Sequence, residues 1–225
     1  MKLFGGNRRL AGLLFVFLIA ALSGQDGLRA QQKLKNGFEV TLEATASSEE
    51  LNFQEDLWVL EVSFKRMRMI PVDITDPKTG KKNREYVMYL VYKAINRPLK
   101  RRIDNTPFKP QNDEDRIPPH QFVPEATLVT EDNNVQNIYI ETIIPEAQKI
   151  INRRESRKPS DPVYKNSVDI VGDLPEITPY DAKSVKALYG VLMWRGVDPK
   201  ADYFTVYLTG FNSAYKKIKG RTAKT

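Results

Sequence analysis

The chain has 225 residues, one histidine, no cysteine and a formal charge of +7. Without cysteine it can form no disulfide, thiol nucleophile or thiolate metal site, and one histidine cannot build a multi-histidine zinc site. Removing residues 1–30 takes away four of the 35 basic and one of the 28 acidic residues and leaves a charge of +4. So mild a charge does not indicate a nucleic-acid-binding domain.

The N-terminus has the layout of a secretory signal peptide. Lys2, Arg8 and Arg9 precede an uncharged run of 13 residues over 10–22, and small residues follow. Signal peptides have this order, and the run is shorter than the roughly 20 residues of a membrane-spanning helix. We predict cleavage after Ser23, with cleavage after Ala30 as the alternative. The mature chain is then expected to be exported to the periplasm or the extracellular space, with no transmembrane segment.

The first strands are predicted from alternating apolar and polar residues. Residues 38–42 and 58–64 alternate in the way that is typical of half-buried strands. Beyond residue 64 the apolar positions change phase, so we expect a bulge or a bend near residues 65–66, with a crossing between two sheets as one form of it.

A hairpin and a long loop are expected next. Residues 76–80 place proline and glycine as a tight turn requires, and residues 86–95 return as a strand rich in tyrosine and β-branched residues. Five prolines then fall within residues 97–121. Because proline disfavours helices and central strands, we expect an irregular loop there.

The second half of the chain is expected to hold most of the remaining strands and one helix. Strands are predicted over residues 126–130 and 135–144, and a helix begins at Pro145, which suits a first helical position. A weaker strand is expected over residues 163–171. Residues 185–194 are almost continuously apolar and predict a central strand, and the last strand alternates through Phe204, Val206 and Leu208.

About eight short strands and one short helix predict a mainly β fold. We expect an antiparallel immunoglobulin-like β-sandwich in a single domain over residues 31–225, with the irregular loop at 97–121. An α+β fold is the alternative.

Two stretches carry a resemblance to a known family. They are Trp58–Val72, Tyr89–Tyr92 and Asn96–Arg97, and then Tyr189–Val191, Trp194, Asp198–Pro199, Asp202–Phe204, Tyr207 and Gly210. These segments resemble a family of uncharacterised, exported, β-rich bacterial proteins over about half of the predicted mature chain. The resemblance implies export and a β fold, and the family has no assigned activity or binding residues to carry over.

We assign no catalytic residue, cofactor or metal site from the sequence. His120 lies in the irregular loop, and we expect it to be an exposed loop residue without a catalytic role. Glu55, Asp56, Glu141 and Asp169 are among the carboxylates that a glycosidase could pair, but acidic residues are too numerous for any pair to be singled out. There is no glycine-rich phosphate-binding loop.

The candidate binding residues are basic or aromatic. Basic groups occur over residues 65–68, 97–102 and 216–224. Such groups usually form solvated surfaces. The functional alternative is that they contact an anionic envelope surface or polymer. Tyr203 and Tyr207 alternate with threonines and could present aromatic rings to a sugar chain. The candidate residues are therefore Arg97, Lys100, Arg101, Arg102, Tyr203 and Tyr207.

The sequence favours a non-catalytic binding or structural module of the cell envelope or extracellular space, because an exported chain lacks the usual catalytic groups. Two alternatives stay open: a polymer hydrolase with paired carboxylates, and a polyanion or polysaccharide adhesion module. The partner is not identified; an envelope polymer or another envelope protein would suit, and nucleic acid is not expected.

Overall fold

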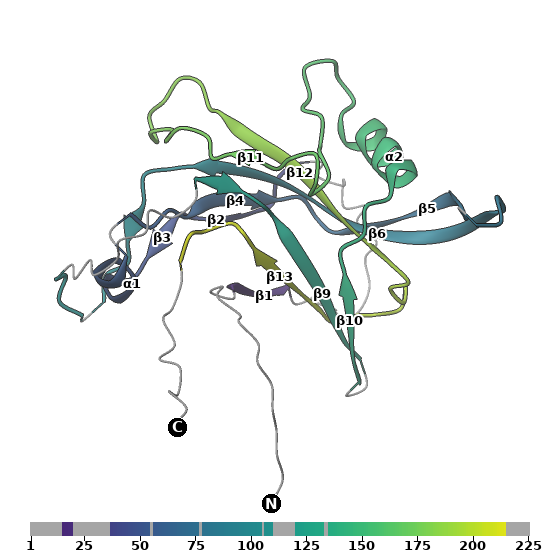
Figure 1. Cartoon of the computed structure of the whole chain (residues 1–225), viewed down its shortest axis with the longest axis horizontal. Coiled ribbons are helices and arrows are strands. Elements are labelled where there is room, and N and C mark those ends of the chain that lie inside the picture. Colours follow the sequence, from purple (N-terminus) through teal and green to yellow (C-terminus); the bar gives the residue numbers. More distant parts are fainter. Residues whose placement is uncertain are drawn as a thin grey trace, which may run out of the picture.

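Figure 1 shows the fold in a computed structural model of the chain, which describes residues 15–19 (backbone only), 37–54, 56–76, 78–104, 106–109, 120–132 and 135–214. The elements in chain order are β1 (Phe15–Ile19), β2 (Val40–Leu42), β3 (Thr45–Ala46), α1 (Ser48–Phe53), β4 (Leu60–Phe64), β5 (Arg68–Thr75), β6 (Lys82–Asn96), β7 (Lys100–Arg101), β8 (Gln121–Phe122), β9 (Glu125–Asp132), β10 (Val135–Ile140), α2 (Pro145–Glu155), β11 (Gly172–Asp173), β12 (Ala187–Arg195) and β13 (Phe204–Thr209).

Two antiparallel sheets form the body of the protein. The large sheet has the order β12-β6-β4-β2, with β5 also paired to β6, and the small sheet has the order β1-β13-β9-β10. Two short pairs add to them, β8 with β11 antiparallel and β3 with β7 parallel. The predicted mainly β, antiparallel architecture is confirmed.

The described residues contain two helices, so the expectation of a single helix was wrong. The helix that was missed, α1, is six residues long. Ser47 caps it: the Ser47 side chain accepts from the Glu50 N–H, and the Glu50 carboxylate accepts from the Ser47 N–H. This capping box, Ser-x-x-Glu, is a helix-start signal that can be read in the sequence.

The two larger apolar clusters of the described residues lie one on each face of the large sheet, and a third, smaller cluster includes Leu57 and Val59. Between the two sheets pack large buried side chains from both, including Tyr92, Leu192 and Trp194 from the large sheet and Leu128 and Val206 from the small sheet. On the opposite face, Ala147 and Ile151 of α2 pack against the large sheet in a second cluster, which also includes Tyr89, Val191 and Met193. In Figure 1, α2 lies on one side of the large sheet, and β9, β10 and β13 cross it obliquely on the other.

β12 is an edge strand of the large sheet, where the sequence predicted a central one. It pairs only with β6 among the named strands, and the isolated bridge from Lys165 to Gly190 covers part of its outer edge. Its residues are continuously apolar because both faces are covered, with Trp194 toward the small sheet and Met193 toward α2. The weak strand predicted over residues 163–171 is also wrong, since this segment forms turns beyond the bridge.

The phase change after residue 64 is a β-bulge, as predicted. Phe64 is opposite Tyr92 and Arg68 is opposite Tyr89, so four steps along one strand oppose three along β6. β4 and β5 therefore lie end to end beside β6 in one sheet, without the crossing between sheets that was considered. The extra residue reverses which face each side chain occupies: Phe64 packs between the sheets, whereas Ile70 packs toward α2.

Other predicted elements are present with shifted bounds. The β5–β6 and β9–β10 hairpins form, and α2 begins at Pro145. Strand β1 falls within the predicted signal peptide and pairs with β13, while residues 1–14 and 20–36 lie outside the described residues. Residues 105 and 110–119 of the predicted loop also lie outside them. Neither helix of the described part is long and apolar enough to cross a membrane.

Candidate functional site

A pocket of about 400 Å³ lies where the C-terminal end of α2 meets the large sheet. We call it the α2 pocket. It is lined by Gly37, Phe38, Lys65, Arg154, Glu155, Arg157, Lys158, Asp161, Pro162, Tyr164 and Tyr189. Its volume is within the range of roughly 300–1,000 Å³ that is typical of sites for small organic ligands.

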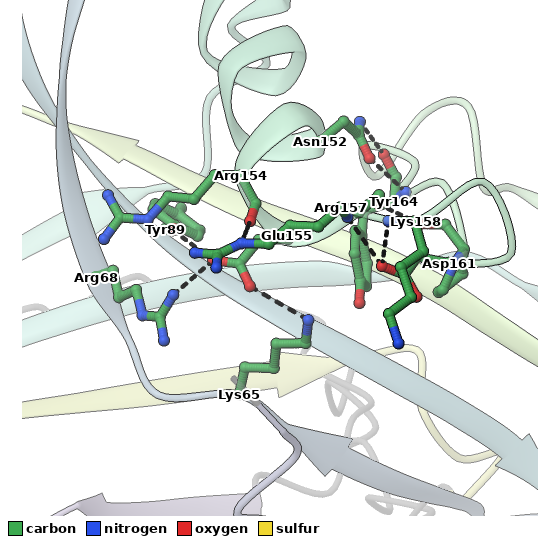
Figure 2. Close-up of polar contacts among 12 residues, drawn as sticks. Lys65, Arg68, Tyr89, Asn152, Arg154, Glu155, Arg157, Lys158, Asp161 and Tyr164 are labelled. Carbon is green, nitrogen blue, oxygen red and sulfur yellow. Dashed lines mark hydrogen bonds and ion pairs between the residues drawn. The ribbon is translucent and has the colours of Figure 1, made fainter. Parts of the chain in front are cut away.

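The base of the pocket is a buried ionic cluster. Lys65 Nζ donates to Glu155 Oε2 at 3.2 Å, and Arg68 Nη1 donates to Glu155 Oε1 at 2.9 Å. The side chains of Lys65 and Glu155 are only 8% and 2% exposed. Two cations thus share one buried carboxylate, and Figure 2 shows both ion pairs.

The bulge and the helix explain how these three charges meet. Lys65 alternates with Phe64 and so lies on the face of the large sheet that α2 covers, and the bulge brings Arg68 to the same face. On α2, Ala147, Ile151 and Glu155 are the buried residues, four apart, so they form one face of the helix. Glu155 therefore ends an otherwise apolar stripe that points at the sheet.

Tyr89 completes the cluster. Its hydroxyl donates to Glu155 Oε1 at 2.8 Å. Burial, followed by the hydrogen bond and the negative charge of Glu155, raises the pKa of Tyr89 to about 12. The phenol consequently stays protonated at neutral pH and acts as a donor to the carboxylate.

Aromatic rings surround Lys65. Its Nζ lies 5.0 Å from the ring centre of Tyr164 and 5.5 Å from that of Phe38, and Lys93 Nζ approaches Phe38 to 5.2 Å. Tyr164 meets Tyr189 edge to face, with ring centres 6.0 Å apart. The pocket therefore combines positive charge with aromatic walls.

Asn152 and Asp161 hold the chain that closes the pocket. The Asn152 side chain accepts from the Tyr164 N–H at 2.7 Å and donates to the Tyr164 carbonyl at 3.0 Å. Asp161 Oδ2 accepts the N–H groups of Arg157 and Lys158, each at 2.8 Å. These bonds fix the turn that follows α2, so this wall is pre-formed (Figure 2).

The pocket has a surplus of positive charge. Among the described residues, its lining holds four cations, Lys65, Arg154, Arg157 and Lys158, and two carboxylates, Glu155 and Asp161. Glu155 is already shared by two cations, and Asp161 accepts from backbone N–H groups. Within the described part of the chain, Arg154, Arg157 and Lys158 form no ion pair, although Arg157 Nε donates to the Arg154 carbonyl at 3.3 Å.

A second hollow, of about 330 Å³, lies beside the β5–β6 hairpin and is lined in part by Lys78, Glu85 and Arg195. There Arg195 binds Glu85 through two hydrogen bonds, of 2.9 and 2.6 Å. Its arginine is thus neutralised by a bidentate pair, unlike the cations at the rim of the α2 pocket.

The predicted basic binding residues lie elsewhere and are mostly paired. Arg97 Nε donates to Glu61 at 3.2 Å, Lys100 binds Glu43 at 3.1 Å, and Arg102 binds Glu50 at 3.1 Å. Arg101 instead lies over the ring of Phe108, with 5.4 Å between the guanidinium carbon and the ring centre. The structure does not bring these residues into the α2 pocket.

The two predicted tyrosines belong to the small sheet. Tyr203 is exposed just before β13, and Tyr207 is half-buried on the strand, opposite Thr127. Neither lines the α2 pocket. Their suggested role as platforms for a sugar chain stays a prediction.

The other residues considered for catalysis are dispersed. His120 is exposed beside β8, as expected. Asp56 is exposed in a turn, and Glu55 lies outside the described residues. Glu141 contacts Ser167 Oγ, and burial, helped by the charge of Glu125, raises the pKa of Glu141 to about 7. Asp169 accepts from Asn166 Nδ2 at 2.7 Å. No cluster of three potential metal-ligating side chains occurs within the described ranges.

Sequence reasoning missed the α2 pocket because it treated residues 65–68 as a solvated surface. The structure corrects this for two of the residues: Lys65 is buried and Arg68 is mostly buried, both paired with Glu155, whereas Arg66 is exposed as expected. Two signals for the pocket can be read in the sequence. The phase change of the strand places Lys65 and Arg68 on one face of the sheet. The spacing of four residues along α2 places Glu155 in line with Ala147 and Ile151.

No protein-family model matches the chain, and searches of curated proteins and of solved structures also found no match.

Proposed function

We propose that the mature protein is a non-catalytic binding module that works outside the cytoplasm and takes an acidic sugar unit of an envelope or extracellular polymer into the α2 pocket. The observation that carries this proposal is the surplus of positive charge over a buried ionic cluster inside an aromatic-walled pocket. Export and the immunoglobulin-like arrangement predicted from the sequence are part of the proposal.

The charges support an anionic ligand. Among the described residues, the pocket lining holds two more cations than carboxylates, and Arg154 and Lys158 lie at the rim without a carboxylate partner in the described part of the chain. A carboxylate or sulfate group placed among them would gain charge-assisted hydrogen bonds in a partly desolvated site.

The aromatic walls and the volume support an organic ring rather than a bare inorganic anion. Phe38, Tyr164 and Tyr189 form an apolar wall beside the cations. Tyrosine offers a flat apolar surface with a polar tip, which suits the faces and hydroxyls of a sugar. This keeps the polysaccharide interpretation and moves it from the β13 tyrosines to the α2 pocket.

The engagement of both pocket carboxylates favours binding over hydrolysis. Glu155 accepts from Lys65, Arg68 and Tyr89, and Asp161 accepts from two backbone N–H groups. A glycosidase needs one carboxylic acid that can donate a proton and a second, free carboxylate. Neither group is in such a position, so we do not propose the paired-carboxylate hydrolase for this pocket.

Calorimetric titration of the full chain with trigalacturonate, a heparin tetrasaccharide and neutral maltotriose tests the proposal. We expect at least one acidic probe to bind at least about tenfold more tightly than maltotriose, with an affinity that falls as salt is raised. Equal affinity for acidic and neutral probes, or no binding of either acidic probe, would contradict it. Chromatography of the titrated sample for shorter sugars would reveal hydrolysis.

A further inference from the structure

Strand β10 presents an open edge of the small sheet. It pairs with β9 on one side and has no partner strand on the other among the described residues. Glu141 N–H donates to the Ala126 carbonyl, in register with the β9–β10 pairing. Backbone groups alternate along an antiparallel strand, so Gln136, Ile138 and Ile140 direct their N–H and C=O groups toward the open edge. The open stretch ends at Ile140, because the Thr142 N–H donates to a carbonyl of β12 and the Thr142 hydroxyl donates to the Ile140 carbonyl.

This edge lacks the features that usually protect one. Residues 135–140 read Val-Gln-Asn-Ile-Tyr-Ile, with no charge and no proline, whereas exposed edges usually carry lysine, proline or a bulge. Two edge strands of the large sheet are protected: β2 is only three residues long, and Lys165 bridges to the outer side of β12. An unprotected strand of this composition is expected to be covered in the working protein.

The edge is also apolar on its outer face. Ile138 and Ile140 lie opposite Val129 and Thr127 and are 69% and 77% exposed, while Tyr139 packs inward. Two large aliphatic side chains thus stand in solvent beside a row of open backbone groups. A second strand that pairs with β10 would cover the two side chains and give the open backbone groups hydrogen-bond partners.

We propose that β10 pairs antiparallel with β10 of a second copy of this chain, which joins the two small sheets into one continuous sheet about a two-fold axis. A second copy fits because the strand has no charge with which to select a different partner and because its pattern is self-complementary. The favoured register places Ile138 opposite the partner subunit's Ile138 and Gln136 opposite the partner subunit's Ile140, so the pairing stays within the open stretch of β10. It brings the two Ile138 side chains together on the outer face, with each Ile140 diagonal to them.

The backbone allows this register. Two-fold antiparallel pairing requires the facing residues to belong to the set that points outward, and Ile138 and Ile140 both do. The contact is smaller than a standard interface of about 800 Å² per partner, so the dimer is expected to dissociate on dilution. This interface is independent of the α2 pocket, which lies on the opposite face of the large sheet.

Sedimentation equilibrium of the full chain from about 1 µM to about 1 mM tests the proposal. We expect a reversible monomer–dimer equilibrium, and we expect I138K/I140K to raise the dissociation constant at least about tenfold, because four like charges would meet at the edge. The control V163K/I177K makes the same chemical change at sites that are 69% and 62% exposed, and it should leave the equilibrium unchanged. A monomer at every concentration, or a dimer that I138K/I140K does not weaken, would overturn the proposal.

Crosslinking tests the register. Because the chain has no cysteine, only the introduced cysteines can form a disulfide. I138C chains should oxidise to a covalent homodimer faster than I140C chains alone, and faster than a mixture of the two variants forms a heterodimer. Crosslinking of the mixture in preference to I138C with itself would overturn the proposed register. Circular dichroism of each variant, which should match that of the unchanged chain, verifies that the fold is kept.

Discussion

Gly190 on β12 lies opposite Tyr92 on β6, and the Tyr92 ring occupies the space that a side chain at position 190 would need. Tyr92 is fully buried between the two sheets, and its ring meets Phe211 edge to face at 5.3 Å. The glycine therefore lets an aromatic side chain of the neighbouring strand lie flat against the backbone.

Replacing Gly190 with alanine should destabilise the protein. The added Cβ would overlap the ring of Tyr92, which is rigid and enclosed, so we expect the free energy of unfolding to fall by about 2 kcal/mol or more. Urea denaturation measures it. The control is G172A, since an added Cβ there would have open space around it, and we expect a change within about 0.5 kcal/mol. Equal stability of the two variants would contradict the packing described.

The hydroxyls of Tyr92 and Tyr89 predict opposite effects of the same substitution. Among the described residues, the buried Tyr92 Oη has no hydrogen-bond partner, so Y92F should leave stability unchanged or raise it. Tyr89 Oη donates to Glu155, and Y89F should lower the free energy of unfolding by about 1–3 kcal/mol. Thermal and urea unfolding of the pair, side by side, provides the measurement. A larger loss for Y92F than for Y89F would be inconsistent with these assignments.

The buried cluster predicts a separation of stability from binding. E155Q leaves Lys65 and Arg68 without their shared counter-charge and should lower stability by about 3 kcal/mol or more, whereas E146Q in the first turn of α2 should change it by less than about 1 kcal/mol. The apolar triple variant K65M/R68M/E155L should regain most of the stability, because it removes all three buried charges.

The same triple variant should lose affinity for the acidic probe, because it removes the charge at the base of the α2 pocket. Calorimetry and urea denaturation on one preparation give both quantities. A triple variant that still binds with unchanged affinity would show that the buried cluster serves stability alone.

The raised pKa of Glu141 predicts that the free energy of unfolding falls as pH rises from about 4.5 to about 7. Its pKa is raised from an ordinary value of 4.5 to about 7, first by burial and further by the nearby charge of Glu125, while Ser167 opposes the shift. The folded state therefore holds a proton that the unfolded state has released. This contribution is fully present below about pH 4.5 and is lost as pH rises through about 7.

E141Q should remove this dependence and flatten the stability profile between pH 4.5 and 7. The difference between the two profiles should be on the order of 1–2 kcal/mol, because solvent screening reduces the effect of a partly exposed group. E125Q is the companion variant and should lower the pKa of Glu141 only slightly. Parallel profiles for E141Q and the unchanged chain would refute the proposed burial of a protonated carboxyl group.

The sequence predicted those parts of the fold that depend on local pattern. The phase change after residue 64 predicted the bulge, the turn residues around Asp76 predicted the β5–β6 hairpin, and Pro145 marked the start of α2. These signals work because alternation and turn chemistry act over a few neighbouring residues. The capping box at Ser47 is equally local, so the start of α1 is also encoded in a few neighbouring residues.

The local signals for the α2 pocket could be read separately, but their meeting could not be predicted, because the parts of the pocket are distant in the chain. Lys65 and Glu155 are 90 residues apart, and Arg68 and Glu155 are 87 apart. A charged residue is normally solvated, and only a partner brought by the fold makes its burial favourable. The edge position of β12 was hidden for a similar reason: a strand covered on both faces is apolar wherever it lies in its sheet.

The most direct test of the central claim compares two charge-matched double variants in calorimetric titration with the acidic probe that binds best. R154Q/K158Q removes two cations from the rim of the α2 pocket, and K149Q/R153Q removes two exposed cations of α2 that do not line it. We predict that R154Q/K158Q weakens binding at least about tenfold while K149Q/R153Q changes it less than about twofold. Equal losses in the two variants would mean that general surface charge, and not the α2 pocket, binds the ligand.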